Sequence, residues 1–533
     1  MTIEHSDVLI MGGGLAGLTL AIQLRREVPG VSVRVLERNR HPVPEAAFKI
    51  GESTVEIGAH YFESVLELKA HLERSQLRKF GFRFFFSDRR EDLNRTVELG
   101  VSRVFPTPSY QLDRGILENF LARHAAELGV DFIDGATVQG IDCAEGEGGS
   151  HTVRYRHDGA VKSASARWLI DASGGRSLLK RKFGLAEKSP HDANAVWFRI
   201  AERIRIDDWF DDTAWSARTE PRERWRSTNH LCGPGYWAWL IPLSSGSHSV
   251  GLVADARMHP LETIDTHAKV MGWFERHQPA LHRALAATNA PIQDFVFQRH
   301  FAHGCKQVFS SQRWAITGIA GVFLDPFYSP GSDYIAIANS YICDLIARDR
   351  RGDSFARETR LYEQLYFSFY RNMLTLYQDQ YPMFGHAELM PLKVTWDYAY
   401  YWGVLCQFFF QRRLTDLPLF ARLAASLTEC EALNRDMQVL LRRAAGSAIG
   451  ANSACMIDQQ KLPWFAELNR GLRDELTVDA LQLRIEDSAR MLRALAGEIL
   501  ARVRALDATR VDDLPALRQL GDGNGSTLLR EAA

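Results

Sequence analysis

The stretch that decides the fold is Val8-Leu9-Ile10-Met11-Gly12-Gly13-Gly14-Leu15-Ala16-Gly17, close to the start of the 533-residue chain. A short apolar run leads into the pattern Gly-x-Gly-x-x-Gly, and an apolar helical face follows at Leu20 and Leu24. The segment 31–35 then alternates with a period of two and ends at the acid Glu37. This order predicts a buried strand, a glycine turn, a helix and a second strand.

The glycine turn indicates a bound dinucleotide, because glycines let the backbone approach a pyrophosphate at the start of a helix. The acid 20 residues beyond the last glycine can accept a hydrogen bond from a ribose 2′-OH. An acid there disfavours a 2′-phosphate, so we expect FAD or NAD rather than NADP. The residues expected to hold the dinucleotide are Gly12, Gly14, Leu15, Ala16, Gly17 and Glu37.

The composition is that of an ordinary globular protein, with 46% hydrophobic and 24% charged residues. A formal net charge of −1 provides no field that would steer the protein to nucleic acid. The longest apolar run, Ala399 to Phe410, is too short for a membrane span, and the N-terminus lacks a signal-peptide pattern. The seven cysteines are scattered without a Cys-x-x-Cys, so we expect neither a disulfide framework nor a metal site. We therefore expect a cytoplasmic protein.

A second stretch, rich in tryptophan, bears on function: Gly235-Tyr236-Trp237-Ala238-Trp239-Leu240-Ile241-Pro242. Two tryptophans at i and i+2 share one face of a strand, as residues of an ordinary aromatic core also would. The string resembles the Trp-x-Trp-x-Ile-Pro box of flavin-dependent halogenases. The resemblance implies a wall between the flavin and the organic substrate, formed by Trp237, Trp239, Ile241 and Pro242.

Other segments resemble the FAD-binding parts of the same family and of the related FAD hydroxylases. Arg114, after Gln111-Leu112-Asp113, resembles their arginine helix, with an ordinary surface helix-start residue as the alternative. Trp168 to Gly174 and Trp314 to Gly318 resemble the second and third FAD segments, and Ala47 to Thr54 resembles the flap over the flavin. These segments favour FAD over NAD. The further cofactor-binding residues that the resemblance implies are Glu52, Ser53, Arg114, Asp171 and Asp325.

The candidate catalytic residue lies in Leu77-Arg78-Lys79-Phe80-Gly81-Phe82-Arg83-Phe84-Phe85-Phe86. As one continuous strand, this segment would place its even-numbered phenylalanines on one face and Lys79, Gly81 and Arg83 on the other. The spacing of Lys79 and Phe84 resembles the Lys-x-x-x-x-Phe strand of halogenases, which implies that Lys79 is catalytic. The alternative is a lysine at a strand edge in solvent.

The segment Phe323-Leu324-Asp325-Pro326-Phe327-Tyr328-Ser329-Pro330-Gly331 resembles the halogenase pattern Phe-x-x-Pro-x-x-Ser-x-Gly. The resemblance implies that Phe323 and Pro326 line the active site and that Ser329 and Gly331 bind halide.

Within this segment, Asp-Pro before the serine resembles the branch that acts on phenols, pyrroles or carrier-bound substrates. Tyr328 stands where the free-tryptophan branch has a glutamate, so tryptophan is the poorer candidate. Two departures from the pattern matter. Pro330 has no N–H, which removes one donor from the halide site. Gly318-Ile319 replaces the Gly-Asp pair of related hydroxylases.

We expect an α/β fold, with a glutathione-reductase-type FAD-binding Rossmann core, a mixed β-sheet substrate region and a helical C-terminal extension. Residues 1–185, with the flap and the Lys79 strand, would form the first part of the FAD-binding domain. Residues 186–300 would form the substrate-side sheet with the tryptophan box. Residues 301–350 would complete the FAD-binding domain, and residues 351–533 would form the helical domain.

The C-terminal region offers two features with open interpretations. Tyrosines recur at near-helical spacing from Tyr362 to Tyr381, and they suit either a stacking wall for a planar substrate or an aromatic interdomain core. An apolar stripe from Leu481 to Val503, with Thr477 as its N-cap, could pack on the body of the chain or on a second subunit in a homodimer. The segment from Gly521 to Ser526 is expected to be a disordered tail.

Together, these resemblances imply an FAD-dependent halogenase of the two-component monooxygenase type. A separate flavin reductase would supply reduced FAD, and chloride or bromide would be the co-substrate. Hypohalous acid relayed to Lys79 would halogenate an electron-rich small aromatic substrate, either free or bound to a carrier protein. The alternatives are an FAD monooxygenase without halide chemistry, which Pro330 favours, and a non-catalytic flavin-binding accessory protein.

Overall fold

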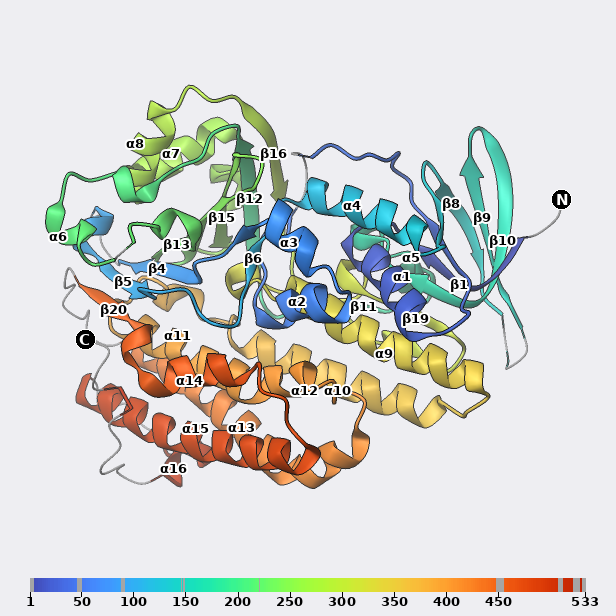
Figure 1. Cartoon of the computed structure of the whole chain (residues 1–533). Helices are drawn as coiled ribbons and strands as arrows, with labels where there is room; N and C mark the ends of the chain where they lie inside the picture. Colours follow the sequence, from blue (N-terminus) through green and yellow to red (C-terminus); the bar gives the residue numbers. More distant parts are fainter. Residues whose placement is uncertain are drawn as a thin grey trace. The chain divides into compact units, whose positions relative to one another are not determined.

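The computed structural model describes residues 4–45, 50–87, 92–144, 146, 149–219, 221–446, 455–506, 511–520 and 528–529. The chain folds into two compact units, each built from three separate stretches (Figure 1). The first unit comprises Met1–Gln76, Leu112–Ser189 and Ala302–Ser368, and the second comprises Leu77–Gln111, Pro190–Phe301 and Phe369–Ala533. The stretch 77–111, which contains Lys79, therefore belongs with the second unit, whereas the sequence had suggested the FAD-binding domain.

The first unit contains the predicted Rossmann core. Its main sheet has the order β18-β19-β10-β1-β2-β7, and β1 pairs in parallel with both β10 and β2. The hairpin β8–β9 extends the sheet from β10. The strands are β1 (Glu4–Met11), β2 (Val33–Leu36), β7 (Asp131–Ile133), β8 (Thr137–Asp142), β9 (His151–His157), β10 (Ala160–Asp171), β18 (Phe309–Ser310) and β19 (Trp314–Ile316).

Helices complete this unit, and a buried asparagine joins two of them. The Asn339 side chain, on α9, donates from Nδ2 to Ala16 O at 3.2 Å, to Thr19 Oγ1 at 3.1 Å and to the Tyr61 hydroxyl at 3.0 Å. Because an unpaired buried amide is costly, this network fixes the start of α1 against α9. The helices are α1 (Leu15–Glu27), α2 (Glu56–His60), α3 (Lys69–Ser75), α4 (Arg114–Glu127), α5 (Leu178–Lys182) and α9 (Gly331–Arg351). A two-stranded ribbon of β11 (Ala186–Lys188) and β17 (His303–Cys305) adds to them.

The second unit contains a mixed sheet with the order β16-β12-β15-β14-β13-β4-β5-β20. Most neighbours are antiparallel, but β13 with β4 and β5 with β20 are parallel. The strands are β4 (Phe82–Phe86), β5 (Val97–Gly100), β12 (Ala193–Ile200), β13 (Thr228–Gly233), β14 (Tyr236–Pro242), β15 (His248–Asp255), β16 (Ile292–Gln298) and β20 (Met456–Asp458).

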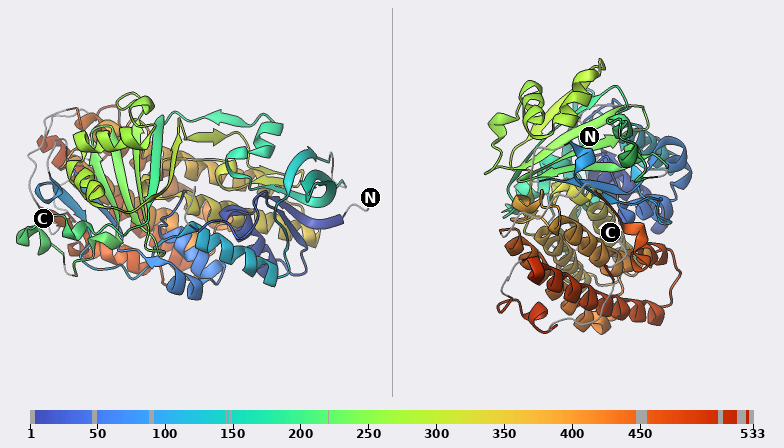
Figure 2. Two further views of the ribbon diagram at one scale, coloured as in Figure 1. Left: turned by 90° about the horizontal axis from the view of Figure 1, so that it is seen from above. Right: turned by 90° about the vertical axis from the view of Figure 1, so that its left-hand side faces the viewer.

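One face of this sheet packs against α7 (His267–His277) and α8 (Pro279–Ala287), as Figure 2 shows. Alternate strand residues meet apolar residues of the two helices in one buried cluster. Its strand members include Phe85, Leu231, Ala238, Leu240, Val250 and Leu252. The tryptophans of β14 alternate with Ala238 and Leu240, so they lie on the opposite face.

The C-terminal extension is helical, as its apolar period predicted. Its helices are α11 (Leu389–Tyr400), α12 (Cys406–Phe410), α13 (Leu417–Ala444), α14 (Pro463–Gly471), α15 (Val478–Leu506) and α16 (Pro515–Arg518). Helix α10 (Ala356–Thr375) precedes them, and it begins in the first unit and ends in the second.

The apolar stripe of α15 is buried within the chain. Leu481 and Ile485 pack with Leu419 and Leu423 of α13, and the stripe is fully buried as far as Val503. Thr477 caps the helix as expected, since its Oγ1 accepts from the Ala480 N–H at 3.2 Å. Of the two alternatives for this stripe, the structure shows packing on the body of the chain. The expected tail from Gly521 to Ser526 lies outside the described residues.

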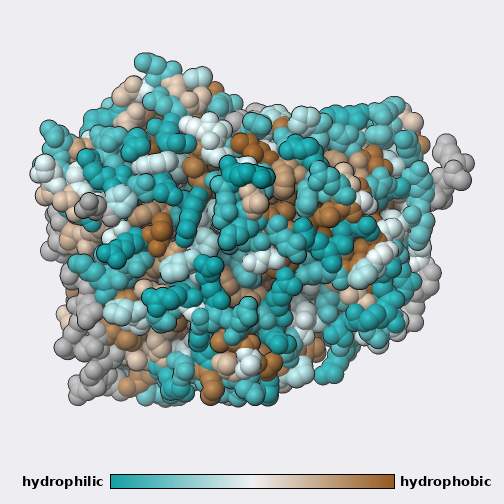
Figure 3. Space-filling view, in the orientation of Figure 1, coloured by the Kyte–Doolittle hydropathy of each residue, from teal (hydrophilic) through white to brown (hydrophobic). Residues whose placement is uncertain are grey.

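The face in Figure 3 is mostly hydrophilic, with apolar residues in small scattered patches. The seven cysteines are free thiols. Within the described ranges, no group of histidine, cysteine and acidic residues is arranged to hold a metal ion. Across the same ranges, every helix is too short or too polar to cross a bilayer.

Candidate functional site

The glycine loop of the first unit has a shape that only glycine permits at two positions. Gly12 has φ of +117°, and a Cβ there would lie 2.3 Å from the carbonyl oxygen of Ala172. A Cβ on Gly17 would lie 1.9 Å from the carbonyl oxygen of Gly12. Gly14 differs, because nothing lies within 4 Å of the Cβ that it lacks. The loop is therefore closed on the protein side and open above Gly14.

The open side of the loop fits the pyrophosphate of FAD. Helix α1 begins at Leu15, directly after Gly14, so its first N–H groups point toward that space. Glu37 stands at the end of β2, where its carboxylate accepts from the Gly13 and Asn39 N–H groups at 2.7 Å each. This contact fixes the acid beside the loop, where an adenosine ribose would lie.

Arg114 and Asp171 organise the segments next to this loop. Arg114 opens α4, and its guanidinium donates to the carbonyls of Ile50 and Gly51. Leu112 N–H donates to the carbonyl of Glu52 at 2.6 Å, so the segment that carries Glu52 and Ser53 is tied to the start of α4. Asp171, at the end of β10, accepts from the Ser173 N–H at 3.0 Å and from the Leu179 N–H at 2.7 Å. Burial raises the pKa of Asp171, and these hydrogen bonds oppose that shift.

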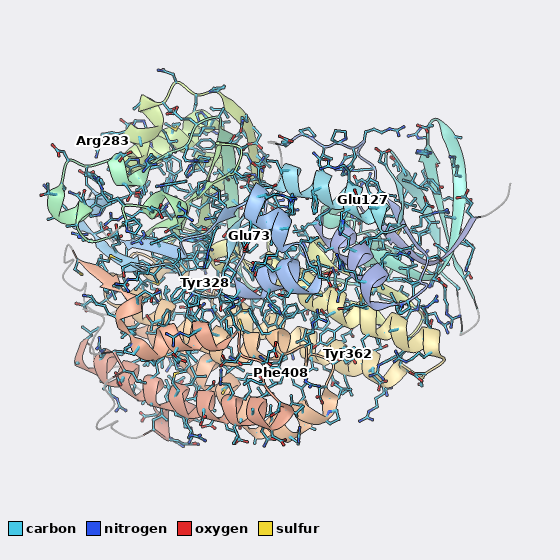
Figure 4. The ribbon with its side chains drawn as sticks, viewed as in Figure 1. Glu73, Glu127, Arg283, Tyr328, Tyr362 and Phe408 are labelled. Carbon is cyan, nitrogen blue, oxygen red and sulfur yellow. The ribbon has the colours of Figure 1, made fainter. Side chains whose placement is uncertain are left out.

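The turn before α9 presents the N-terminus of that helix. The Asp325 carboxylate is fully buried and accepts from the Phe327 N–H at 2.9 Å, which caps the turn Pro326–Tyr328. Ser329 then adopts φ of +51°, and Pro330, with φ of −77°, leads directly into the helix. Gly331 is the first residue of α9. Tyr328, labelled in Figure 4, is buried and packs edge-on against Phe327.

The backbone of Phe323 forms two hydrogen bonds with the backbone of His303, whose side chain is neutral. The N–H and the carbonyl of Phe323 both pair with the backbone of His303 at 2.9 Å. Burial lowers the pKa of His303 to about 4, with the charge of Lys180 adding to the effect. The Lys180 ammonium lies 3.0 Å from His303 Nδ1, so a neutral imidazole accepts its hydrogen bond.

In the second unit, the segment around Lys79 is not the single strand that we expected. Leu77–Arg78 form β3, which pairs with β6 (Tyr110–Gln111), and β4 begins only at Phe82. Gly81, between the two strands, has φ of +73° and breaks the alternation. The expectation that Lys79 and Phe82 lie on opposite faces is therefore wrong. The Lys79 ammonium lies over the Phe82 ring, 3.3 Å from the centroid.

Lys79 is also buried, with 4% of its surface exposed, so it is not a strand-edge lysine in solvent. The backbone around it is held at several points. Lys79 N–H donates to Ser109 O at 2.9 Å, and Phe80 N–H donates to Arg226 O at 3.1 Å. On the other side of the turn, Thr228 N–H donates to Gly81 O at 3.1 Å.

A layer of aromatic rings extends from Phe82 across the tryptophan face of the sheet. His230 of β13 pairs in register with Phe84 on one side and with Trp239 on the other. Its ring stacks on Phe84 at 4.7 Å between centroids, meets Phe82 at 5.2 Å and lies 5.0 Å from Trp237. The ring centroids of Trp237 and Trp239 lie 5.6 Å apart, and both side chains are buried.

His230 belongs to this layer, although its segment resembles no motif of a known family. Its position follows only from the strand register, which the sequence does not specify. The signal that could have found it is the alternation through Thr228, His230 and Cys232, a strand pattern next to the tryptophan box.

Two tyrosines of the C-terminal half contact this aromatic layer. The Trp237 indole N–H donates to the Tyr381 hydroxyl at 2.9 Å. The ring centroid of Tyr398, on α11, lies 6.3 Å from that of Phe82. Trp239 instead donates to Ser249 Oγ at 3.1 Å. Tyr362, labelled in Figure 4, has another role, because its hydroxyl donates to Asp344 at 2.6 Å within the first unit. The tyrosine series is thus divided between the tryptophan face and ordinary core positions.

The opposite face of β4 is fixed by a buried ion network. Glu98 of β5 pairs with Arg83 and with Arg224, whose Nε lies 2.8 Å from the carboxylate, and all three side chains have no exposed surface. Burial alone would raise the pKa of Glu98, but the two guanidinium groups hold it below its usual value. Because breaking a buried pair leaves an uncompensated charge, this network locks β4 against β5.

The chain is similar to known FAD-binding domains and to known halogenases. A family model described as an FAD binding domain matches residues 5–249. A flavin-dependent halogenase of Dictyostelium discoideum is 26% identical over 434 residues, which cover 76% of this chain and 70% of that protein. A 1H-pyrrole-2-carbonyl-[peptidyl-carrier protein] chlorinase of Pseudomonas fluorescens is 25% identical, covering 62% of this chain and 73% of its own length. The crystal structure of the halogenase PltM has the same fold, with a TM-score of 0.65, 17% identity and coverage of 93% of this chain and 96% of that chain.

Proposed function

We propose that the chain, which is similar to flavin-dependent halogenases, chlorinates or brominates an electron-rich aromatic substrate with Lys79 as the catalytic amine. The observation that carries this assignment is the burial of a lysine beside the tryptophan face of the sheet. There the ammonium is shielded from water and held over an aromatic ring, as an amine that acts on an oxidant needs to be.

FAD would be held in the first unit by the glycine loop and Glu37, with Arg114 and Asp171 shaping the adjoining segments. When bound in its reduced form, FAD supplies the electrons with which oxygen and a halide yield hypohalous acid and water. Ser329 and Gly331 would bind the halide at the N-terminus of α9, where the helix dipole favours an anion. Pro330 contributes no N–H there, so the helix supplies the donors.

Lys79 would act on the oxidant. Its ammonium donates a hydrogen bond to the oxygen of hypohalous acid, which polarises the oxygen–halogen bond. The aromatic carbon then forms the bond to halogen and loses its proton, and the oxygen leaves as water. In the second unit, the chamber around Lys79 would be walled by Trp237, Trp239, Ile241 and Pro242. In the first unit, Phe323 and Pro326 would line the FAD site. Burial keeps water from competing for the oxidant.

The test is the variant Lys79→Ala, assayed with a generic flavin reductase, bromide and a panel of phenols, pyrroles and indoles. Brominated product should fall below detection, while reduced flavin is still oxidised at the wild-type rate. The matched control is Arg78→Ala, an exposed neighbour that should retain full product yield. Unchanged bromination by Lys79→Ala would refute the role of this lysine.

A second candidate, an FAD monooxygenase without halide chemistry, is favoured only by Pro330. The distinguishing measurement is the dependence of turnover on bromide or chloride, followed by the mass of the product. A hydroxylated product formed without halide would support the monooxygenase. We expect no product without halide.

The partners are proposed on chemical grounds. A separate flavin reductase would supply reduced FAD, because only one dinucleotide loop is found in the sequence. A carrier-bound aromatic substrate fits the Asp-Pro pair at residues 325–326 and the relative that acts on a carrier-bound pyrrole. A homodimer and a cytoplasmic location stay predictions.

A further inference from the structure

The contact between Lys79 and Phe82 is a close cation–aromatic pair. The ammonium nitrogen lies 3.3 Å from the ring centroid, and both side chains are buried. A cation over a ring face is attracted by the negative potential of the π-system, and the attraction grows when water is excluded. Phe84, the phenylalanine of the Lys-x-x-x-x-Phe pattern, stacks on His230.

The backbone produces this contact. The positive φ of Gly81 interrupts the strand, so the side chain two residues before it reaches the face on which Phe82 lies. The Phe82 ring is itself fixed, because Phe84, His230 and Tyr398 surround it at 5.8, 5.2 and 6.3 Å between centroids. Because the Phe82 ring is held in this way, it presents one fixed face to the ammonium group.

We propose that Phe82 is the positioning residue for the catalytic amine, acting through its π-face and not through its bulk. The inference rests on the proposed function for its catalytic consequence, although the contact itself does not depend on catalysis. A lysine side chain has four rotatable bonds, and holding its ammonium before the oxidant arrives removes that freedom from the reaction step. Phe82 thus sets where the halogen is delivered.

The experiment replaces the Phe82 ring by phenylalanines with one, two and three ring fluorines, which weaken the π-face with little change of shape. Product formed per flavin oxidised should fall stepwise with each fluorine, on the order of tenfold in total. The matched series is at Phe85, on the same strand but within the apolar cluster of the opposite face, and it should be flat. A flat series at Phe82, or equal declines at both positions, would overturn the proposal.

A second measurement needs no activity. In protein labelled with ¹³C at the lysine ε-carbon, the Lys79 signal, assigned by its loss in Lys79→Ala, should be shifted upfield by the ring current of Phe82. The variant Phe82→Leu should remove that shift and Phe85→Leu should preserve it. An unshifted Lys79 signal in the wild-type protein would refute the contact. If the wild-type protein makes no halogenated product while the shift is present, the proposed function fails and the positioning contact stands.

Discussion

At the scale of single residues, Gly81 is the position on which the candidate amine depends most directly. Its φ of +73° is a backbone conformation that L-residues adopt at a cost of about 1–2 kcal/mol. The substitution Gly81→Ala should destabilise the protein by about that amount and should shift the turn that carries Lys79. We expect product per flavin oxidised to fall, measured together with the free energy of unfolding.

The control for this prediction is Gly159→Ala. Gly159 has φ of +79° and nothing within 4 Å of its absent Cβ, and it lies in the turn between β9 and β10 of the first unit. It should lose a similar free energy of unfolding with no loss of product. If both variants lost product equally, a general effect of stability would explain the result, and the turn at Gly81 would have no special role.

Gly81 also explains which features of the candidate site could be predicted from the sequence and which could not. The neighbours of Lys79 in the sequence made it the candidate catalytic residue, which stays a prediction, but they did not reveal the face that its side chain occupies. Alternation assumes an unbroken strand, and a glycine at positive φ invalidates the assumption without leaving any trace in the hydrophobic pattern. His230 was missed for a related reason, since only the register of β13 against β4 and β14 brings it between the rings.

At the scale of elements, strand β14 depends on the segment before α11. Tyr381 accepts the Trp237 indole N–H at 2.9 Å through its hydroxyl and accepts the Gly235 N–H at 2.9 Å through its carbonyl. The substitution Tyr381→Phe leaves a buried indole N–H without its acceptor, at a cost of about 1–3 kcal/mol. We expect Trp237 to reorient and the halogenated fraction of flavin turnovers to fall, measured by product mass against oxygen consumed.

Tyr400→Phe is the matched change in α11. It removes a buried hydroxyl whose partner is Asn372 at 3.3 Å, on the neighbouring helix α10. Its cost in stability should be comparable, while the halogenated fraction should stay at the wild-type value. A wild-type fraction in Tyr381→Phe would show that the indole needs no support from this tyrosine.

Helix α15 shows what hydrophobic periodicity can predict and what it cannot. The period of α15 correctly gave a helix with an apolar stripe, but a stripe fits a neighbouring helix and a second subunit equally well. The structure decides between them because Leu481 and Ile485 meet Leu419 and Leu423 of α13. A partner surface is not encoded in one helix alone, so the choice required the fold.

At the scale of the whole molecule, the order of strand, glycine loop, helix and strand was enough to predict the Rossmann core, because each step is local. The division of the chain into two units was harder to predict from the sequence. Residues 77–111 belong with the second unit because β4 pairs with β13, more than 130 positions further along the chain. Pairings of such separation depend on tertiary packing, which no window of sequence contains.

Binding of FAD should stabilise the whole molecule, and Gly14 allows that effect to be isolated. Gly14 has φ of −83°, which any residue can adopt, and nothing lies within 4 Å of its absent Cβ. The substitution Gly14→Val should therefore leave the free protein folded, at a cost of about 1 kcal/mol for a poorer N-cap of α1, while its side chain fills the space that the pyrophosphate needs. At FAD concentrations about 100 times the dissociation constant, the wild type should gain about 2.7 kcal/mol, seen as a higher unfolding temperature in calorimetry. Gly14→Val should show no rise, and Gly272→Val, in α7 of the second unit, should show the full rise. A normal rise with FAD in Gly14→Val would mean that the cofactor does not approach the chain over this loop.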